Sequence, residues 1–331
     1  MDQNNAGRQR EGYVYATYGD EKYLKHAVSS AVSIRRYDQK RPIALVTTPT
    51  HREFLARHDL SAFFDEILDL DDEHASITGF KHNVHLYMPF DRNLYLDSDI
   101  IWCRDADPLW KSFSPYRYTI TGMQVADNFF GAPKHLGVIG DILFRRRQKT
   151  LRRFGLTYLS RVQSGMIYNA DRKMAQAVGE KAGEFLSRID ETHFQSRLKE
   201  KGRDEESCEW SLAMAMSKLD LQVYPWYHGQ NSPQLDFIDR YTEYDPLFQQ
   251  VRCLYYCDKF VYNFKGIQAG WLRSLLTKLV TLMPGKGDYM HVTPFCLHFG
   301  WYHQKQPFLD YSDAIWKQVV AGGKPQDAEH R

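Results

Sequence analysis

Short β-branched or aromatic runs alternate with longer segments of helical periodicity through the first hundred residues of this chain. Strands are predicted at residues 13–17, 42–48, 66–70 and 93–96, and helices after the first strand and over 49–58 and 81–88. Strands joined by crossover helices form right-handed units and a mainly parallel sheet. The sequence therefore predicts an α/β fold in which ligands bind at the carboxyl ends of the strands.

Two carboxylates one residue apart follow directly on the strand predicted at 93–96. In the triplet Asp97-Ser98-Asp99, side chains at i and i+2 of an extended segment lie on one face. Both carboxylates can then reach one hard cation, Mg²⁺ or Mn²⁺. Such triplets are also common in solvated loops, so the position of this one at the end of a strand is what favours a metal site.

Composition limits the classes of protein that fit. The 331 residues are 43% hydrophobic and carry a net charge of +2, which predicts an ordinary folded protein and indicates no polyanionic partner. Met1 to Gly12 is polar and no apolar run approaches the roughly 20 residues of a membrane span, so no transmembrane segment is predicted. Five cysteines without metal spacing fit a reducing compartment. The expected location is the cytoplasm.

The second half of the sequence is less regular. Strands are predicted at 118–125, 162–168, 221–225, 260–264 and 292–298, and helices at 171–189, 209–219, 268–282 and 312–320. No internal repeat or Ser/Gly linker divides the chain. One α/β domain with a helical and loop-rich elaboration after about residue 230 is therefore expected.

Several short motifs resemble, in order, those of nucleotide-sugar glycosyltransferases with the GT-A fold. They are the opening YATYGDEKYLKHAVSSAVSIRR, the basic residue Lys81, NLYLDSDIIW, DPLW, VQSGMIYN, EWSL and FCLHFGWYHQKQP. The chain is most similar to the retaining group that includes glycogenin and bacterial lipopolysaccharide galactosyltransferases (glycosyltransferase family 8). The resemblance runs from about Tyr13 to Pro307.

The resemblance implies a single GT-A domain over residues 11–310, followed by a C-terminal helix and tail over 311–331. Residues 11–125 would form the nucleotide-sugar half and 126–310 the acceptor half. The implied activity is metal-dependent transfer of a hexose from a UDP-sugar to a hydroxyl acceptor, with retention of configuration. A glycan or glycolipid is the implied acceptor, and the oligomeric state is left open. Alternatives are transfer to modified bases in DNA, a catalytically reduced sugar-nucleotide or glycan binding protein, and a metal-dependent phosphohydrolase or nucleotidyltransferase.

The resemblance also assigns a metal and phosphate site. Asp97, Asp99 and His298 would hold Mn²⁺ or Mg²⁺, which neutralises the departing nucleoside diphosphate. Ser98 and Gly300 belong to the same cofactor-binding segments. Lys305 would face the phosphates, although its spacing from His298 is one residue longer than in the family pattern.

Other matched positions surround the expected donor. Ala16, Thr17, Tyr18 and Tyr23 match the region that packs around the nucleobase and ribose, where tyrosines offer a ring face and a hydroxyl. Ordinary packing at the edge of a sheet is the alternative for these residues. Lys81 matches a basic residue near the donor sugar and phosphate, and its alternative is a solvated helix position.

Two positions depart from the family pattern under the sugar. Gln163 stands where the family commonly has Asn, and Cys208-Glu209 stands where it commonly has Asp followed by Gln. Glu209 is predicted either to stabilise an oxocarbenium-like transition state or to attack the anomeric carbon covalently. In the family, departure and attack on the same face without a covalent intermediate is the competing mechanism. Its alternative is a helix N-terminal acid, and the neighbouring Glu205 and Glu206 remain alternative equivalents.

Basic and aromatic segments bear on the acceptor. The run from Arg145 to Arg153 is either a solvated helix face or a contact for phosphates of nucleic acid or an anionic glycolipid. The helix predicted at 268–282 is either a lid over the sheet or a membrane contact. Aromatic residues that either stack on sugars or pack in the core are Trp226, Tyr227, His228, Trp271, Trp301 and Tyr302.

Overall fold

The computed structural model describes residues 10–124, 137–200, 203–239, 241–254, 267, 269–281, 291–300 and 304–321. The chain divides into two compact units, each of which is described by itself. The first comprises Met1–Ala27, Gln39–Ser98 and Lys111–Pro225, and the second comprises Val28–Asp38, Asp99–Trp110 and Trp226–Arg331. The domain boundaries predicted from the sequence stay a prediction.

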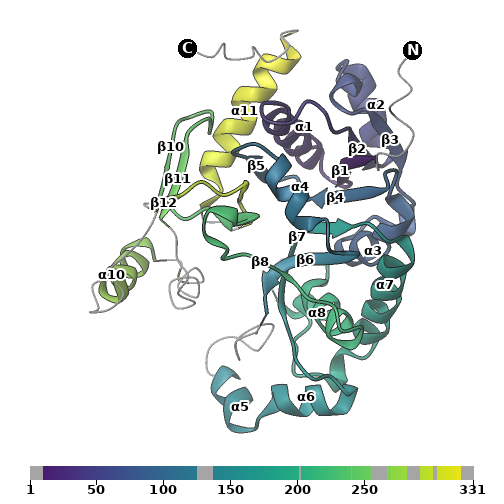
Figure 1. Ribbon diagram of the computed structural model, residues 1–331, viewed down its shortest axis with the longest axis vertical. Coiled ribbons are helices and arrows are strands. Elements are labelled where there is room, and N and C mark those ends of the chain that lie inside the picture. Colours follow the sequence, from purple (N-terminus) through teal and green to yellow (C-terminus); the bar gives the residue numbers. More distant parts are fainter. Residues whose placement is uncertain are drawn as a thin grey trace. The chain divides into compact units, whose positions relative to one another are not determined.

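The first unit is built on a seven-stranded sheet with the order β3-β2-β1-β4-β7-β6-β8 (Figure 1). Strand β1 is parallel to both of its neighbours, β2 and β4; β2 is also parallel to β3, and β6 to β8. Strand β7 is antiparallel to its two neighbours, β4 and β6. The predicted α/β class with a mainly parallel sheet is confirmed. The strands are β1 (Glu11–Thr17), β2 (Ile43–Thr47), β3 (Glu66–Asp69), β4 (Arg92–Leu96), β6 (Tyr118–Met123), β7 (Arg161–Asn169) and β8 (Tyr224–Pro225).

Most α-helices predicted in the first unit are present, and the one predicted over 81–88 is the exception. Two helices, α1 (Glu21–Arg35) and α4 (Asp107–Phe113), have residues in both units. The apolar residues that recur at helical spacing in α1 are all buried: Leu24, Ala27, Val28, Ala31 and Val32. The first unit holds α2 (Pro49–Arg57), α3 (Ile77–His82), α5 (Gly137–Leu143), α6 (Arg146–Phe154), α7 (Arg172–Ser187) and α8 (Glu209–Lys218), with short 3-10 helices at Ser61–Phe63, Asp72–His74, Val84–Tyr87, Ile189–Glu191 and Arg197–Lys199.

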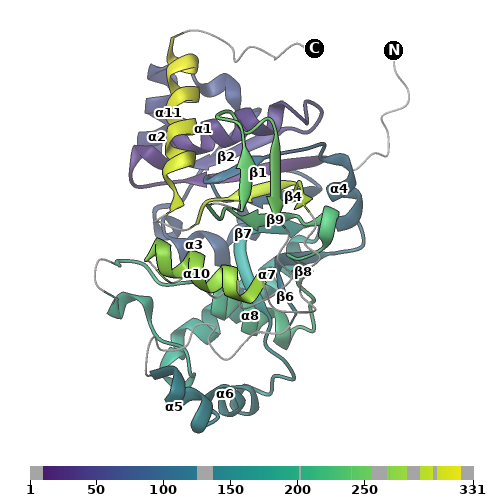
Figure 2. The same cartoon turned by 90° about the vertical axis from the view of Figure 1, so that its left-hand side faces the viewer.

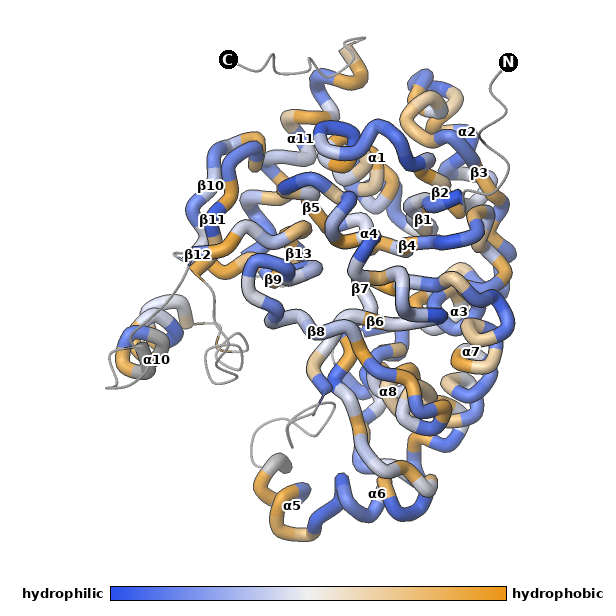
Figure 3. The backbone as a smooth tube through the Cα atoms, in the orientation of Figure 1, coloured by the Kyte–Doolittle hydropathy of each residue, from blue (hydrophilic) through white to orange (hydrophobic). Residues whose placement is uncertain are grey.

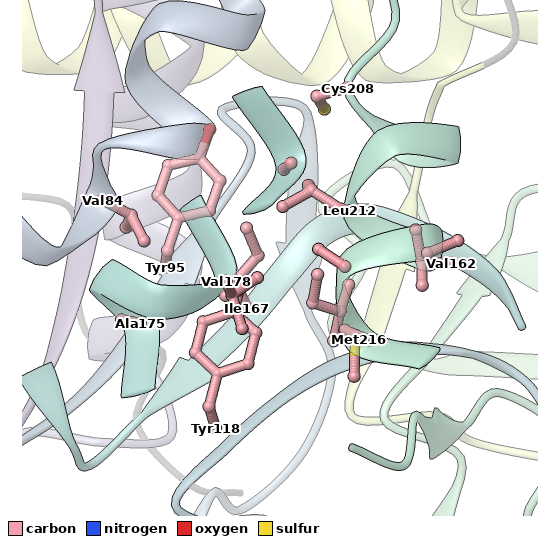
Figure 4. Packing of buried hydrophobic residues seen from close by; sticks show 14 of the residues in the cluster. Val84, Tyr95, Tyr118, Val162, Ile167, Ala175, Val178, Cys208, Leu212 and Met216 are labelled. Carbon is pink, nitrogen blue, oxygen red and sulfur yellow. The ribbon is translucent and has the colours of Figure 1, made fainter. Parts of the chain in front are cut away.

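Helix α8 runs through the core of the first unit. Trp210 to Ser217 are buried on every side, as expected for a helix that packs against α7 and β7 at once. Figure 4 shows Leu212 and Met216 of this helix among residues from β4, β6, β7 and α7. Tyr95 and Cys208 belong to the same buried cluster, so the core fixes side chains next to the end of β4.

The helix predicted over 81–88 is wrong in its position. Helix α3 begins earlier because Ser76 caps it, with the Ser76 hydroxyl accepting a hydrogen bond from the Gly79 backbone N–H at 2.9 Å. It ends at His82, and residues 84–87 form a separate 3-10 turn. Lys81 therefore lies in the last turn of α3, where its side chain is buried.

The second unit contains two three-stranded sheets. In one, β13 (Cys296–His298) pairs antiparallel with β5 (Ile100–Trp102) and parallel with β9 (Gln234–Asp236). The other is antiparallel and consists of β10 (Thr242–Tyr244), β11 (Val251–Leu254) and β12 (His291–Val292); Figure 2 shows β10 and β11 side by side. This unit also has α10 (Gly270–Thr281), α11 (Gln306–Val320) and a 3-10 turn at Gly229–Asn231.

Two predictions in the second unit need correction. The single strand predicted at 292–298 is two strands in different sheets, because Pro294 between them has no N–H for a ladder. Helix α11 begins at Gln306 instead of Ser312, with Pro307 in its first turn, where a proline is well tolerated.

The remaining predicted segments have mixed outcomes. The strands β6, β7 and β8 and the helices α7, α8 and α10 are confirmed with small changes at their ends. The strand predicted at 260–264 lies outside the described residues, as do Trp301, Tyr302 and Cys257. Cys103, Cys208, Cys253 and Cys296 are free and buried. In the described part of the chain, no helix is both long and apolar enough to cross a membrane.

Candidate functional site

A buried lysine holds the first carboxylate of the triplet in the first unit. Lys81 Nζ lies 2.8 Å from Asp97 Oδ1 and donates to Ser164 Oγ at 3.1 Å. Tyr95 OH donates to the same Asp97 oxygen at 2.7 Å, and Ser164 Oγ lies 3.3 Å from Cys208 Sγ. These five residues are named the lysine cluster. The end of β4 and the start of α8 position it.

Charge and burial act against one another in the lysine cluster. Burial disfavours the charged form of Lys81, but the Asp97 carboxylate and, more weakly, Glu209 outweigh it, so the pKa of Lys81 is raised. Burial also raises the pKa of Cys208 to about 11, even though the Lys81 charge opposes the shift. Cys208 is therefore a neutral thiol at pH 7, and it does not replace the carboxylate that the family commonly has there.

A glycine allows the polar groups of β7 to approach the cluster. A Cβ atom on Gly165 would lie 2.8 Å from Gln163 Oε1 and 3.2 Å from Asp97 Oδ2. The Gly165 backbone N–H donates to Gln163 Oε1 at 2.9 Å, and the Gly165 carbonyl accepts from the Asp97 N–H. The amide of Gln163, which is buried, is thus folded back onto its own strand.

The three acidic candidates near α8 differ in what they do. Glu205 accepts from the Ile77 N–H at 2.9 Å and so caps α3, while Glu206 accepts from Ser196 and from the Arg197 N–H. Glu209 is the first residue of α8 and is partly exposed. Among the described residues, its carboxylate makes no hydrogen bond or ion pair. Of these three acids, Glu209 is therefore the most available to a ligand.

The second carboxylate of the triplet lies beside a histidine in the second unit. His298 Nε2 is 3.6 Å from Asp99 Oδ1, and Lys305 Nζ is 2.7 Å from Asp99 Oδ2. His298 Nδ1 is 2.8 Å from Asp236 Oδ1. These four residues are named the histidine cluster. The pairing of β13 with β5 and β9 brings them together, since His298 is in register with Ile100 and Asp236.

The histidine cluster suits a metal ion. Because the Asp236 carboxylate only accepts hydrogen bonds, Nδ1 of His298 carries the proton and Nε2 keeps its lone pair when the ring is neutral. The 3.6 Å from Nε2 to Asp99 is too long for a hydrogen bond. Ligands of an octahedral ion at about 2.1 Å lie about 3 Å apart when adjacent and about 4 Å apart when opposite. Asp99 and His298 can therefore share one cation.

Gly300 has a steric reason to be glycine. A Cβ atom at this position would lie 2.5 Å from His298 Cε1, so any other residue would displace the imidazole. The motif His298-Phe299-Gly300 thus leaves room for the imidazole ring between Asp99 and Asp236. Phe299 assists from the backbone, since its N–H donates to the Asp99 carbonyl at 3.0 Å.

The residues predicted near the nucleobase occupy different environments in the first unit. Thr17 is buried, and its hydroxyl lies 2.8 Å from that of Thr47 and 3.2 Å from His51 Nδ1. Ala16 and Tyr18 pack partly buried against the core, and burial followed by the charges of Glu205 and Asp97 raises the pKa of Tyr18. Tyr23 is 41% exposed. Their contact with a nucleotide stays a prediction.

Sequence patterns missed several members of both clusters. Tyr95 precedes Asp97 by two residues on one strand, so the alternation of side chains was a usable signal for it. Asp236 precedes His298 by 62 residues and meets it only through the register of β9 and β13. No local motif marks Asp236. Trp226, considered as a sugar-stacking residue, is buried.

In fold, the chain is similar to two solved glycosyltransferases. The apo form of GlyE from Streptococcus pneumoniae TIGR4 matches with a TM-score of 0.50 and 12% identity, over 95% of this chain and 63% of that chain. The galactosyltransferase LgtC, in complex with donor and acceptor sugar analogues, also gives a TM-score of 0.50 and 12% identity, over 96% of this chain and 98% of that chain. No protein-family model and no curated protein matches the sequence.

These matches bear on the fold and on nothing finer. At 12% identity they confirm the predicted likeness to GT-A glycosyltransferases and the α/β class. The chain spans less than two thirds of the length of GlyE and nearly all of LgtC. Donor, acceptor and mechanism remain to be argued from the chain's own residues.

Proposed function

We propose that this chain is a metal-dependent, retaining glycosyltransferase that moves a hexose from a UDP-sugar to a hydroxyl group of a glycan or glycolipid. The observation that carries the proposal is the histidine cluster, in which His298 is fixed by Asp236 and faces Asp99 with its second nitrogen. The GT-A fold supports it, because ligands of such sheets bind at the carboxyl ends of strands and Asp97 directly follows β4.

The metal ligands in this proposal are Asp97, Asp99 and His298. Asp97 is two positions from Asp99 in the sequence, so their Cα atoms are at most about 7 Å apart. This short connection is why Asp97 is included with the other two ligands. When bound, Mn²⁺ or Mg²⁺ supplies Lewis-acid neutralisation of the charge on the departing diphosphate. Ser98 and Gly300 contribute the backbone on either side of these ligands.

Two lysines are proposed to meet the donor. Lys305 is partly exposed, so it can leave Asp99 and pair with the phosphates of UDP. Lys81 is buried and bonded to both Asp97 and Ser164, so it stays in place and holds Asp97 beside the donor sugar. Ala16, Thr17, Tyr18 and Tyr23 form the nucleoside side of the site in this proposal, and Gln163 contacts a sugar hydroxyl.

Glu209 is proposed as the carboxylate near the anomeric carbon. Positive charge develops there as UDP departs, and an ionised carboxylate stabilises it or attacks it. The carboxylates of two neighbours are engaged, Glu205 as a cap of α3 and Glu206 in a turn, whereas that of Glu209 makes no hydrogen bond or ion pair among the described residues. This difference supports Glu209 over its neighbours in the proposed role.

The test is release of UDP from a panel of UDP-sugars with Mn²⁺, with and without a chelator. Slow hydrolysis by water needs no acceptor, so the proposal expects chelator-sensitive release from one sugar. Glu209→Gln should lower turnover by about 100-fold or more with little change in donor affinity. The exposed Glu53→Gln in α2 is the matched control.

Other outcomes would replace the proposal. Tight UDP binding without release, even with candidate glycan acceptors, would indicate a binding protein. Release of monophosphate or pyrophosphate would indicate a phosphohydrolase or nucleotidyltransferase. Absence of UDP binding would remove the nucleotide-sugar interpretation altogether.

A further inference from the structure

Helix α5 in the first unit presents its apolar side chains to solvent. Ile139, Ile142 and Leu143 are 52%, 45% and 72% exposed, and Phe144, which follows the helix, is 61% exposed. These four residues are named the α5 patch. Figure 3 shows the hydrophobic colour of α5 beside the hydrophilic start of α6. Large apolar side chains that gather at one exposed place indicate an interaction surface.

The orientation of α5 is the reverse of that expected for a surface helix. Ile139, Ile142 and Leu143 lie at i, i+3 and i+4, which is one face of a helix, and that face is exposed. Asp141 is 4% exposed, and Arg146 donates to its Oδ1 at 3.2 Å. The helix thus turns its carboxylate inward and its apolar face outward. An apolar partner for that face would account for this arrangement.

A stripe of cations continues from the α5 patch along α6. Arg145, Lys149 and Arg152 have the spacing i, i+4 and i+7, and all three are exposed. Within the described ranges these three make no ion pair, whereas Arg146 pairs with Asp141 and Arg153 with Glu191. The three residues are named the α6 stripe. Arg145 directly follows Phe144, so apolar and cationic groups adjoin.

Helix α6 is firmly attached to the first unit on its other side. Thr150 and Phe154 are buried, and the Thr150 hydroxyl accepts from the His193 backbone N–H at 2.9 Å. The Phe154 ring packs edge-on against Phe185 of α7. The α6 stripe therefore lies on the face opposite the one that packs against the first unit, and α5 lies beside α6 in both Figure 1 and Figure 2.

We propose that the α5 patch and the α6 stripe dock this protein on the surface of an anionic phospholipid bilayer. The apolar side chains would enter the boundary between headgroups and acyl chains, and the three cations would meet lipid phosphates. The phosphates of a nucleic acid would contact the three cations. They would not contact the four exposed apolar side chains of the α5 patch. The inference goes beyond the proposed transfer reaction and does not depend on it.

Helix α10 in the second unit is the natural comparison. Trp271, Leu275 and Leu279 also form an exposed apolar row at i, i+4 and i+8. Its Arg273 is directed to the chain itself, donating to the Ile267 carbonyl at 2.7 Å. Substitutions in α10 therefore remove exposed apolar surface without touching the proposed lipid contact, and they serve as the matched control.

The experiment is co-sedimentation of the full chain with vesicles. One set is phosphatidylcholine alone and the other an equimolar mixture of phosphatidylcholine and phosphatidylglycerol. Binding is expected to the mixed vesicles and to fall with salt. Arg145→Gln with Lys149→Gln and Arg152→Gln should weaken it about 100-fold, since each cation contributes about a factor of five. Leu143→Ser with Phe144→Ser should weaken it at least about 10-fold.

The altered residues are exposed, so the variants are expected to fold, which circular dichroism checks. The control Leu275→Ser with Leu279→Ser should leave vesicle binding unchanged. The proposal is overturned by equal binding to both kinds of vesicle, by no binding to either, or by loss only in the α10 control. It is also overturned if duplex DNA binds through the α6 stripe while the α5 substitutions have no effect on either partner.

Discussion

Asp97 and Asp99 are one residue apart but belong to different units and have different partners. Asp97 is held through one oxygen by Lys81 at 2.8 Å and Tyr95 at 2.7 Å. Asp99 has Lys305 at 2.7 Å on one oxygen and His298 at 3.6 Å from the other. Each carboxylate therefore has a lysine as its counterion, and Asp99 also lies beside an imidazole nitrogen of His298.

The two lysines differ in how easily they can move. The side chain of Lys81 is 9% exposed and also donates to Ser164, whereas that of Lys305 is 21% exposed. Leaving a buried ammonium without its carboxylate is costly, and a partly exposed one regains water. Lys81 therefore keeps one oxygen of Asp97 bound within the first unit, whereas Lys305 can leave Asp99 when a ligand arrives.

The largest effect expected from this difference is on stability. Asp97→Asn should lower the free energy of unfolding by about 3–5 kcal/mol, because it leaves the Lys81 charge buried and unpaired. Asp99→Asn should cost less, on the order of 1 kcal/mol, since the partly exposed Lys305 can turn to water when its carboxylate is removed. Urea unfolding of the two variants measures the contrast. Adding Lys81→Met to Asp97→Asn should restore most of the loss. Equal destabilisation by the two aspartate variants would show that Lys81 depends on its carboxylate no more than Lys305 does.

The second effect concerns metal affinity. Asp99→Asn should weaken Mn²⁺ binding in the presence of UDP on the order of 100-fold, because it removes one anionic ligand. Asp97→Asn is best tested together with Lys81→Met, because the double variant leaves no unpaired lysine charge in the core to disturb the fold. Calorimetric titration with Mn²⁺ provides the measurement. Unchanged affinity in Asp99→Asn would remove the histidine cluster from the proposed metal site.

The third effect tests the support of the histidine. Asp236→Ala should weaken Mn²⁺ binding by about 10–100-fold, because His298 loses the carboxylate that fixes its ring and its protonated nitrogen. Asp236→Asn keeps an acceptor at the same place and should cost less. The exposed Asp313→Asn on α11 is the charge-matched control in the same unit. A loss in Asp236→Asn as large as in Asp236→Ala would show that charge, and not orientation, is what His298 receives.

Local patterns predicted the first unit better than the second for a physical reason. Strands β1, β2 and β4 and helices α1 and α2 follow from periodicity and from residues near in sequence. The break between β12 and β13 comes from Pro294 and from the partners that each strand finds, which are far away in the chain. The site divides in the same way. Asp97, Asp99 and His298 lie in recognisable motifs, whereas Asp236 and the contact of Lys81 with Asp97 arise only from strand register and core packing.

The smallest expected effect is that of Lys305→Met on ligand affinity. Its expected sign differs between Mn²⁺ and UDP, so it separates an exchangeable counterion from a structural one. Lys305→Met should raise the affinity for Mn²⁺ alone by about 5-fold, because the ion no longer displaces a counterion from Asp99. The same variant should lower the affinity for UDP in the presence of Mn²⁺, because the phosphates lose a cation. Lys305→Arg keeps the charge and should change neither affinity in these directions. If Lys305→Met lowers both affinities, Lys305 supports the site structurally and does not exchange partners, and the contrast between the two lysines fails.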